Sequence, residues 1–332
     1  MTVRVRRNIF FGLTAFLVAG LGTIWFLVFQ PMPDFGSSLT ERLSADPVRL
    51  EKHVRALAES FPSRSGEDPA RLDLVASYIR EQFAASGAVV EDQTFVVDGV
   101  KYRNIVARFA RKNLAFEPPL VIGAHYDTVA GTPGADDNAS GVAGLIELSR
   151  LLGEFPPAMP VELVAWTLEE PPFFGTEDMG SAVYAGLAAE SDRLPRLVVS
   201  LEMIGYFSDE PGSQIFPSFL MRLFYPSEGN FLMVAGRISD TMTIRKVKAG
   251  LRRHTYLPIY SLAVPEGTFG EDLSDHRNFR SHNVPAIMLT DTAFYRNTEY
   301  HKPGDTPDRL DYRRMALVVQ AVHGLIREES SR

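Results

Sequence analysis

The stretch LVIGAHYDTVAGTPGADDNASGVAGLIELSRLL, residues 120 to 152, decides the fold of this 332-residue chain. It begins with a short apolar run, Leu120 to Gly123, which is typical of a strand buried in a sheet. A polar loop follows and leads to a helix over Ser140 to Leu152, whose start is marked by Asn138 and Ser140. A strand followed by a helix is the repeating unit of an α/β domain.

The rest of the chain repeats this alternation. Two strand-like runs are joined by Asp98-Gly99, which is a favoured hairpin turn. The predicted strands are Val89 to Val97, Tyr102 to Phe109, Leu120 to Gly123, Val161 to Thr167, Leu197 to Met203 and Ala286 to Thr290. Helical periodicity also covers Asp46 to Glu59, Asp68 to Ser86 and Arg313 to Ile326. We therefore predict one α/β domain over residues 47–332, with three layers and a mixed, largely parallel central sheet between helices.

The N-terminal segment is predicted to lie outside that domain. Ile9 to Phe29 is a run of 21 residues without charge, and at about 1.5 Å per residue it spans roughly 31 Å, close to the hydrocarbon thickness of a bilayer. Three arginines precede it and no basic residue follows before Arg42, so the positive-inside rule predicts a cytoplasmic N-terminus and a periplasmic or otherwise extracytoplasmic domain. A cleaved signal peptide is the alternative, but the QPMP at residues 30–33 is a poor cleavage site. We predict a transmembrane anchor over residues 1–30 and a linker over residues 31–46.

Charge and composition exclude some classes of partner. Without the first thirty residues the chain carries 31 basic and 41 acidic side chains, a balance of −10, which argues against a nucleic-acid partner. The basic stretch over residues 245–253 has helical spacing and is expected to be a solvated helix face. The chain has no cysteine, so it has no disulfide framework and no lipid attached through a thiol.

Acidic and histidine side chains recur where the predicted strands end. In open α/β sheets, ligands bind at the carboxyl edge of the strands. The candidates are His125 and Asp127 in HYDTV, Asp137 in GADDNASG, the pair Glu169 and Glu170, Glu202 in SLEMIGY, and His301 in EYHKPGDT. Each motif alone is a common surface feature, whereas their combination is specific.

These residue types match the needs of a metal-dependent hydrolase. Zinc takes nitrogen and oxygen ligands at about 2.0 to 2.2 Å, and a two-metal site needs a bridging carboxylate with terminal ligands on each side. In the adjacent pair, one carboxylate can bind metal while the other moves protons between water and a leaving amine. The carboxylate of Asp127 can accept a hydrogen bond from the second ring nitrogen of His125.

The motifs resemble those of the co-catalytic zinc aminopeptidases. HYDTV, PGADDNASGVA, LEE with GTEDMGS, LEMIGY, SDHRNF with VPAIMLTDT, and YHKPGDTPDRLDY share that family's order and approximate spacing from about residue 50 to 328. The wider superfamily includes bacterial leucyl aminopeptidase, glutamate carboxypeptidase and glutaminyl cyclase, so the resemblance implies a zinc exopeptidase-like fold. It implies that Asp137 bridges two zinc ions, one completed by Glu170 and His301 and the other by His125 and Glu202. Glu169 is then the general base, Asp127 supports His125, and the peptide bond after Asp137 is cis.

The chain departs from the family pattern at two places. Glu202 stands where many relatives have aspartate, which leaves one zinc as the alternative to two. PPFFG at residues 171–175 replaces a short glycine turn, and its two aromatics either pack a rigid loop or form the wall of an apolar substrate pocket. The resemblance also implies a substrate-side insertion at about residues 208–264, part of which covers the site. It places Asp275 and His276 near the site without a role.

The sequence therefore predicts a zinc-dependent exopeptidase that removes N-terminal residues from peptides. Its expected partners are a peptide substrate and, through the N-terminal helix, a membrane; the pattern carries no signal for an oligomeric state. Glutaminyl cyclisation and carboxypeptidase action are the alternatives on the same metal ligands. A non-catalytic, receptor-like ectodomain is a further alternative, but such a protein is expected to lose ligands that this chain retains.

Overall fold

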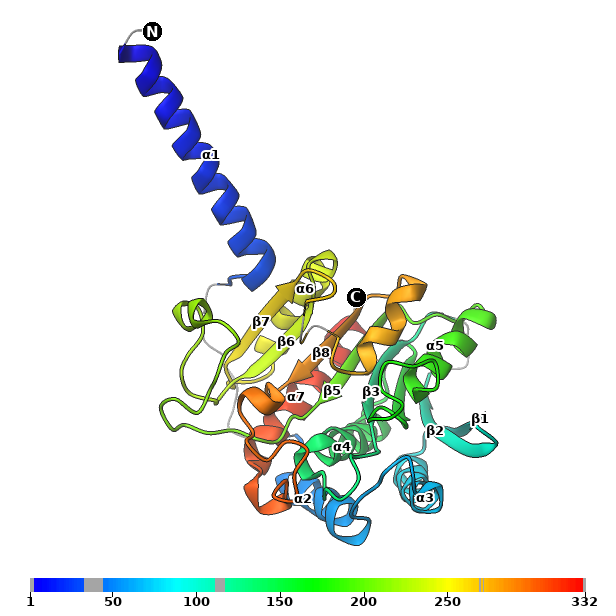
Figure 1. The fold of residues 1–332 in the computed structure, drawn as a ribbon. Coiled ribbons are helices and arrows are strands. Elements are labelled where there is room, and N and C mark those ends of the chain that lie inside the picture. Colours follow the sequence, from blue (N-terminus) through cyan, green and yellow to red (C-terminus); the bar gives the residue numbers. More distant parts are fainter. Residues whose placement is uncertain (1–2, 33–43, 111–116, 269, 271, 331–332) are drawn as a thin grey trace.

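The computed structural model describes residues 3–32, 44–110, 117–268, 270 and 272–330 (Figure 1). Its α-helices are α1 (Val3–Phe29), α2 (Pro47–Arg55), α3 (Pro69–Ala85), α4 (Gly141–Glu154), α5 (Gly180–Glu190), α6 (Thr241–Arg252) and α7 (Tyr312–Glu329). Its strands are β1 (Val89–Val97), β2 (Val100–Phe109), β3 (Leu120–His125), β4 (Val161–Trp166), β5 (Leu197–Glu202), β6 (Leu232–Arg237), β7 (Ile259–Val264) and β8 (Ala286–Thr290). Short helical turns include η1 (Ala56–Ser60), η3 (Ala135–Ser140), η4 (Phe219–Leu223), η5 (Ile238–Asp240), η6 (Asp275–His282), η7 (Ala293–Tyr295) and η8 (Pro307–Arg309).

The strands form one eight-stranded mixed sheet in the order β1-β2-β4-β3-β5-β8-β6-β7. Strands β4, β3, β5 and β8 pair in parallel, whereas β1 with β2, β2 with β4, and β6 with β8 pair in antiparallel. The hairpin between β1 and β2 turns at Asp98 and Gly99, whose φ angles of 49° and 80° both lie in the left-handed region. The mixed, largely parallel sheet predicted from the sequence is confirmed.

Helices cover both faces of this sheet, which gives three layers (Figure 1). Successive side chains of a strand point to opposite faces, and β3 shows it because Ile122 joins the larger apolar cluster while Val121 joins the smaller one. The larger cluster lies under α2, α3, α4, α6 and α7. The smaller one holds Trp166, Tyr184 and Phe279 under α5 and η6. The predicted α/β architecture is therefore correct.

Helix α1 extends away from the domain, and only its carboxyl end lies near the sheet (Figure 1). In the part of the chain whose placement is described, no helix combines the length and the apolar character needed to cross a membrane. The predicted transmembrane helix therefore has no support from the structure, and the predicted topology stays a prediction. Most of the predicted linker, residues 33–43, lies outside the described residues.

Candidate metal centre

The parallel strands bring the candidate residues to one edge of the sheet. His125 ends β3 and Glu202 ends β5, while Glu169 and Glu170 follow shortly after β4. Because these three strands are parallel neighbours, their carboxyl ends meet. Asp137 lies in η3, directly before α4. His301 comes from the loop after β8, and the structure thus gathers all seven predicted side chains, Asp127 included.

Three left-handed backbone positions shape the loops at this edge. Leu168, Met203 and His301 have φ angles of 59°, 49° and 58°. This conformation is uncommon for residues other than glycine, and it occurs preferentially at functional sites. Leu168 precedes Glu169 and Met203 follows Glu202, so the chain turns sharply beside these two glutamates. The peptide bond between Asp137 and Asn138 is cis, as the family resemblance implies.

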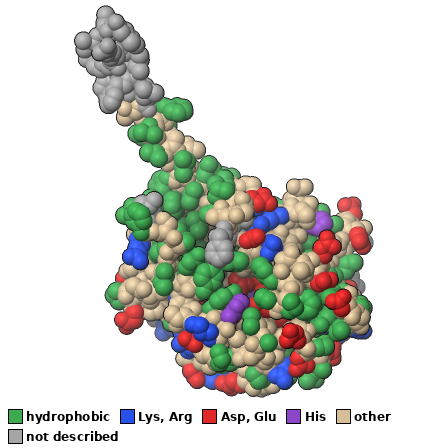
Figure 2. Space-filling model, in the orientation of Figure 1, with side chains coloured by type: hydrophobic (Ala, Val, Ile, Leu, Met, Phe, Trp, Pro, Cys, Tyr) green, Lys and Arg blue, Asp and Glu red, His purple; other side chains and the backbone are tan. Residues whose placement is uncertain are grey.

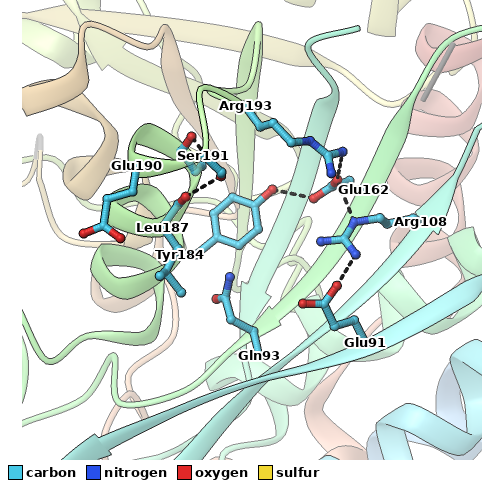
Figure 3. Close-up of a pocket in the computed structure, with 10 residues that line it drawn as sticks. Glu91, Gln93, Arg108, Glu162, Tyr184, Leu187, Glu190, Ser191 and Arg193 are labelled. Atoms are coloured by element: carbon cyan, nitrogen blue, oxygen red, sulfur yellow. Dashed lines mark hydrogen bonds and ion pairs between the residues drawn. The ribbon is translucent and has the colours of Figure 1, made fainter. Parts of the chain in front are cut away.

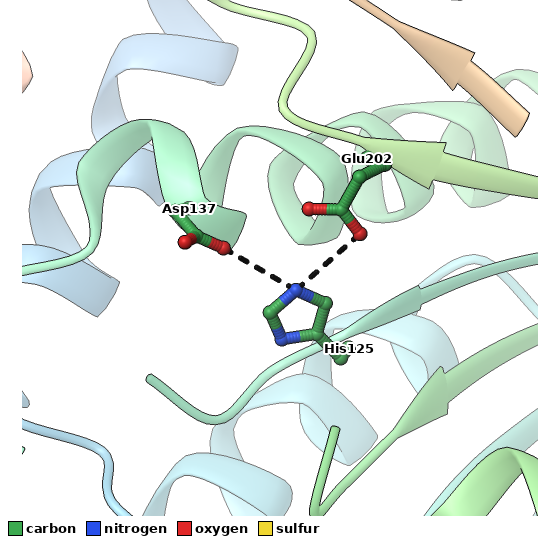
Figure 4. A group of neighbouring side chains, drawn as sticks. All are labelled: His125, Asp137 and Glu202. Atoms are coloured by element: carbon green, nitrogen blue, oxygen red, sulfur yellow. Dashed lines mark ion pairs between the residues drawn. The ribbon is translucent and has the colours of Figure 1, made fainter. Parts of the chain in front are cut away.

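One group of ligands surrounds the His125 ring (Figure 4). Its Nε2 atom lies 3.4 Å from Asp137 Oδ1 and 3.5 Å from Glu202 Oε2. Glu169 is slightly farther, with Oε2 at 3.8 Å from the same nitrogen. These side chains are fully or almost fully buried. The group can hold a cation between one nitrogen and two carboxylates while Glu169 stays beside it.

A second group surrounds His301. Its Nε2 atom lies 3.1 Å from Asp137 Oδ2 and 3.2 Å from Glu170 Oε2. The two oxygens of Asp137 therefore face different histidines, Oδ1 toward His125 and Oδ2 toward His301. A carboxylate in this arrangement can bridge two cations.

The donor set fits divalent cations such as zinc. Ligands at 2.0–2.1 Å from a tetrahedral metal lie about 3.3–3.4 Å from one another, and the distances between the nitrogens and oxygens here, 3.1 to 3.5 Å, are close to that. Buried polar atoms normally have hydrogen-bond partners. Among the described residues, four buried atoms of this site have none: His125 Nε2, Asp137 Oδ2, Glu170 Oε1 and His301 Nε2.

The pKa values of the candidate ligands also favour a bound dication. Burial and the nearby Asp137 raise the pKa of Glu170 to about 7, and burial raises the pKa of Glu169 well above its usual value. Burial lowers the pKa of His301, but the neighbouring carboxylates of Asp137 and Glu170 outweigh this and raise it to about 10. Crowded carboxylates thus retain protons that a dication would displace, because ligands bind metal in their deprotonated forms.

Asp127 has a different main contact from the predicted one. Its two carboxylate oxygens accept hydrogen bonds from the backbone N–H groups of Glu169 and Glu170, at 3.1 and 3.0 Å. His125 Nδ1 lies 3.2 Å from the backbone carbonyl oxygen of Asp127 and 3.6 Å from its carboxylate. Asp127 therefore orients the imidazole mainly through its backbone, and its carboxylate fixes the chain that carries the two glutamates.

Two further residues of the site were missed in the sequence. Ser274 donates a hydrogen bond of 2.8 Å to Glu202 Oε2, which holds the longer side chain at this position. The ring of Tyr300 stacks on His301 with ring centres 3.7 Å apart. Burial raises the pKa of Tyr300, and the charges of Asp137 and Glu170 raise it further. Ser274 and Tyr300 stand in the motifs SDHRNF and YHKPGDTPDRLDY, but the residue types alone do not reveal these contacts.

The two aromatics of PPFFG have different surroundings. Phe173 packs against the larger apolar cluster and lies edge-on to Tyr102, at 6.2 Å between ring centres. Phe174 lies under the guanidinium of Arg277, 4.8 Å from the ring centre. Phe173 therefore packs the loop against the core, whereas Phe174 contacts the cationic side chain of Arg277. Asp275, which begins η6, is buried, and burial raises its pKa to about 7.

The aromatic segment from Gln214 onward divides between two places. Gln214 donates to Thr292 Oγ1 at 2.9 Å and Ile215 N–H to the carbonyl of Tyr295 at 2.8 Å, on the loop that leads to His301. Farther along, Tyr225 donates to the carbonyl of Ser261 in β7, at the sheet edge away from β3 and β5. The carbonyl of Phe231 also accepts a hydrogen bond of 3.0 Å from Arg296 on that loop, so Gln214, Ile215 and Phe231 contact the site's surroundings, whereas Tyr225 packs on β7.

A separate hollow of about 480 Å³ lies between β2, β4 and α5 (Figure 3). Its charges are paired with one another: Glu162 receives hydrogen bonds from Arg108 at 3.0 Å and from Tyr184 at 2.6 Å. Arg108 also pairs with Glu91. The hollow is not lined by any of the seven predicted site residues, and the metal centre remains the candidate site.

Comparisons with known proteins agree with this geometry. The model of Peptidase family M28 matches residues 104–326. The protein YfbL of Escherichia coli strain K12 is 48% identical over 290 residues, which cover 85% of this chain and 88% of YfbL. Aminopeptidase YwaD of Bacillus subtilis is 29% identical over 238 residues, 68% of this chain and 45% of YwaD. The solved structure of BSAP, a zinc aminopeptidase from Bacillus subtilis, superposes with a TM-score of 0.69 at 15% identity, over 87% of this chain and 96% of that one.

Proposed function

Because the chain belongs to peptidase family M28 and is a peptide hydrolase, we propose that it is a zinc-dependent aminopeptidase that removes N-terminal residues from peptides. The observation that carries the proposal is Asp137, whose two carboxylate oxygens face two different histidines at 3.4 and 3.1 Å. In this proposal His125 and Glu202 would hold one zinc ion, Glu170 and His301 would hold the other, and Asp137 would be shared between them. When bound, the ions supply Lewis-acid polarisation of the scissile carbonyl and a lowered pKa for water.

Glu169 is proposed as the general base. Its carboxylate lies beside the His125 group at 3.8 Å, while its backbone N–H is held by Asp127. Glu169 takes a proton from the attacking water and returns it to the amine that leaves when the C–N bond breaks. Burial raises the pKa of Glu169, which makes its carboxylate a stronger base once the proton is lost.

Tyr300 is proposed as a hydrogen-bond donor to the scissile carbonyl. Its ring is fixed by stacking on His301, and its phenol stays protonated because burial raises its pKa. A protonated phenol can donate a hydrogen bond to the oxygen atom that becomes negative as water adds. Donors preorganised in this way stabilise the transition state.

Two complete ligand groups favour hydrolysis over cyclisation. The family resemblance associates cyclisation with a single zinc ion, whereas here His125 and His301 each face two carboxylates. Glu202 reaches the His125 group despite its extra methylene, and Ser274 holds it there. The departure from aspartate at this position is therefore compatible with two metals.

The variant Glu169→Gln tests the assignment of the base. It keeps the size of the side chain and removes the group that accepts the proton, so we expect peptide hydrolysis to fall about 10²–10⁴-fold with zinc content unchanged. The control is Glu177→Gln, an exposed glutamate in the loop after the site, which should keep full activity. Both variants are assayed on peptides with free N-termini, free C-termini and N-terminal glutamine. Full activity in Glu169→Gln would exclude it as the base, and cyclisation alone in the unmutated protein would exclude the aminopeptidase.

A further inference from the structure

The carboxyl end of α1 is built into the domain. The last carbonyl groups of a helix have no donors within the helix. Here Thr241 Oγ1 donates to the carbonyl of Leu27 at 3.1 Å, and Ser261 Oγ donates to that of Phe29 at 3.0 Å. Lys248 Nζ donates to the carbonyls of Phe29 and Gln30, at 3.3 and 3.2 Å. Side chains of the domain thus supply hydrogen-bond donors to the last carbonyl groups of α1.

Only part of the basic stretch of α6 is the solvated face that the sequence predicts: Lys246 and Arg253 are exposed, whereas Arg245 and Lys248 contact the end of α1 and the residues after it. Thr241, Arg245 and Lys248 are spaced so that they lie on one side of a helix. Arg245 donates to the carbonyl of Pro31 at 2.9 Å and lies 5.0 Å from the ring centre of Phe26. Lys248 is only 5% exposed, and burial lowers its pKa to about 8. We call Thr241, Arg245, Lys248 and Ser261 the clasp.

Beyond the clasp, α1 exposes apolar side chains on all sides. Every residue from 16 to 25 is exposed, and none of them is charged. Phe16, Leu17 and Val18 are 80%, 61% and 63% exposed, and at about 100° per residue they point in three directions. A partner groove would cover one face, whereas a helix that is apolar all round is typical of a lipid environment or a protein core.

The domain continues this apolar surface at the base of α1. Phe224 stacks on Phe29 with ring centres 4.4 Å apart and is 46% exposed. In η4 beside it, Phe219 and Leu223 are 77% and 74% exposed. We call Phe219, Leu223 and Phe224 the collar. Figure 2 shows apolar side chains gathered where α1 meets the domain.

We propose that a lipid bilayer covers residues 16–25 of α1 together with the collar. In this proposal the clasp fixes the position of the collar relative to α1, so that both contact the same bilayer. The all-round exposure of α1 favours lipid over a protein groove, and the collar adjoins the end of α1 through the stacking of Phe224 on Phe29. Arg222, which is exposed within η4, lies where it can meet anionic head groups. This surface is separate from the metal centre, so the inference goes beyond the proposed function.

Because the chain has no cysteine, single labels test the proposal directly. The full chain carries Leu223→Cys with a polarity-sensitive NBD label and is mixed with phosphatidylethanolamine–phosphatidylglycerol vesicles containing a lipid quencher. The matched control is Leu74→Cys on α3, which is 59% exposed and lies on the far side of the domain from α1 (Figure 1). We expect a several-fold rise in emission with a blue shift at position 223, reversed by the quencher, and no change at position 74.

Several outcomes would overturn the proposal. If the protein binds vesicles but the emission of the label at position 223 does not change, the collar does not contact lipid. A rise in emission at position 223 that occurs without vesicles and disappears when the protein is diluted would show that a second copy of the chain covers the collar. In Lys248→Met, the label at 223 should lose its quenching while one at Val18→Cys keeps it; equal quenching at both would exclude the clasp. Peptide hydrolysis measured on the same samples bears on the proposed function alone.

Discussion

Asp305 links the two loops that carry Asp137 and His301. It follows His301 by four residues and its carboxylate accepts the backbone N–H groups of Asp136 at 3.1 Å and Asp137 at 3.1 Å. On the opposite side, the buried guanidinium of Arg64 donates to the carbonyl of Gly134 at 2.8 Å. Asp305 thus binds backbone N–H groups of this loop and Arg64 binds one of its backbone carbonyl groups. Together they fix the carboxylate of Asp137 between His125 and His301.

The variant Asp305→Asn should disturb this loop without touching a ligand. The side-chain NH2 of the new asparagine would face a backbone N–H group, so two donors would meet and both would lack an acceptor. An unpaired buried group of this kind lowers the free energy of unfolding by about 1–3 kcal/mol. We also expect zinc affinity to fall about 10–100-fold, as is usual when groups behind metal ligands are replaced. Urea unfolding and competition with a chelator measure the two effects. Asp308→Asn, in the same segment with its carboxylate 77% exposed, should change neither; unchanged zinc affinity in Asp305→Asn would separate Asp305 from the site.

At the scale of elements, Gly123 in β3 leaves room for the Trp166 ring of the neighbouring strand β4. A Cβ atom at Gly123 would lie 2.0 Å from the ring of Trp166, which is fully buried. Gly123 is also two residues before His125. The packing that forms the smaller apolar cluster therefore depends on the absence of a side chain here.

Gly123→Ala should lower the free energy of unfolding by about 1–3 kcal/mol, because overpacking displaces a side chain that has no room to move. Gly186→Ala is the matched control: Gly186 lies inside α5, and nothing is within 4 Å of its added Cβ. It should raise stability by about 0.5–1 kcal/mol, since alanine favours a helix over glycine. Chemical unfolding of the metal-free protein measures both, and equal stability of the two variants would contradict the packing argument.

Elements with a clear apolar period could be predicted, and elements without one could not. β1 and β8 match their predicted bounds, Val89–Val97 and Ala286–Thr290. Strands β6 and β7 were missed because they lie within a segment rich in aromatics, proline and glycine. Helix α5 was missed because it is short and rich in alanine and glycine, and only one side of it is buried.

For the whole molecule, the sequence predicts which side chains meet but not what holds them. The positions of His125, Glu169 and Glu202 after predicted strands were enough to place them at one edge. The contacts of Ser274 and Tyr300 depend on loops whose paths have no local signal. The same holds for the clasp, since Lys248 and Gln30 are 218 residues apart in the chain.

The measurement that tests the central claim most directly is a zinc titration of the metal-stripped full chain, with bound zinc and release of N-terminal residues followed together. The two ligand groups that share Asp137 predict saturation at two zinc ions per chain and activity that returns only as zinc binds. Saturation at one ion with cyclisation of N-terminal glutamine, or full peptide hydrolysis without zinc, would contradict the account.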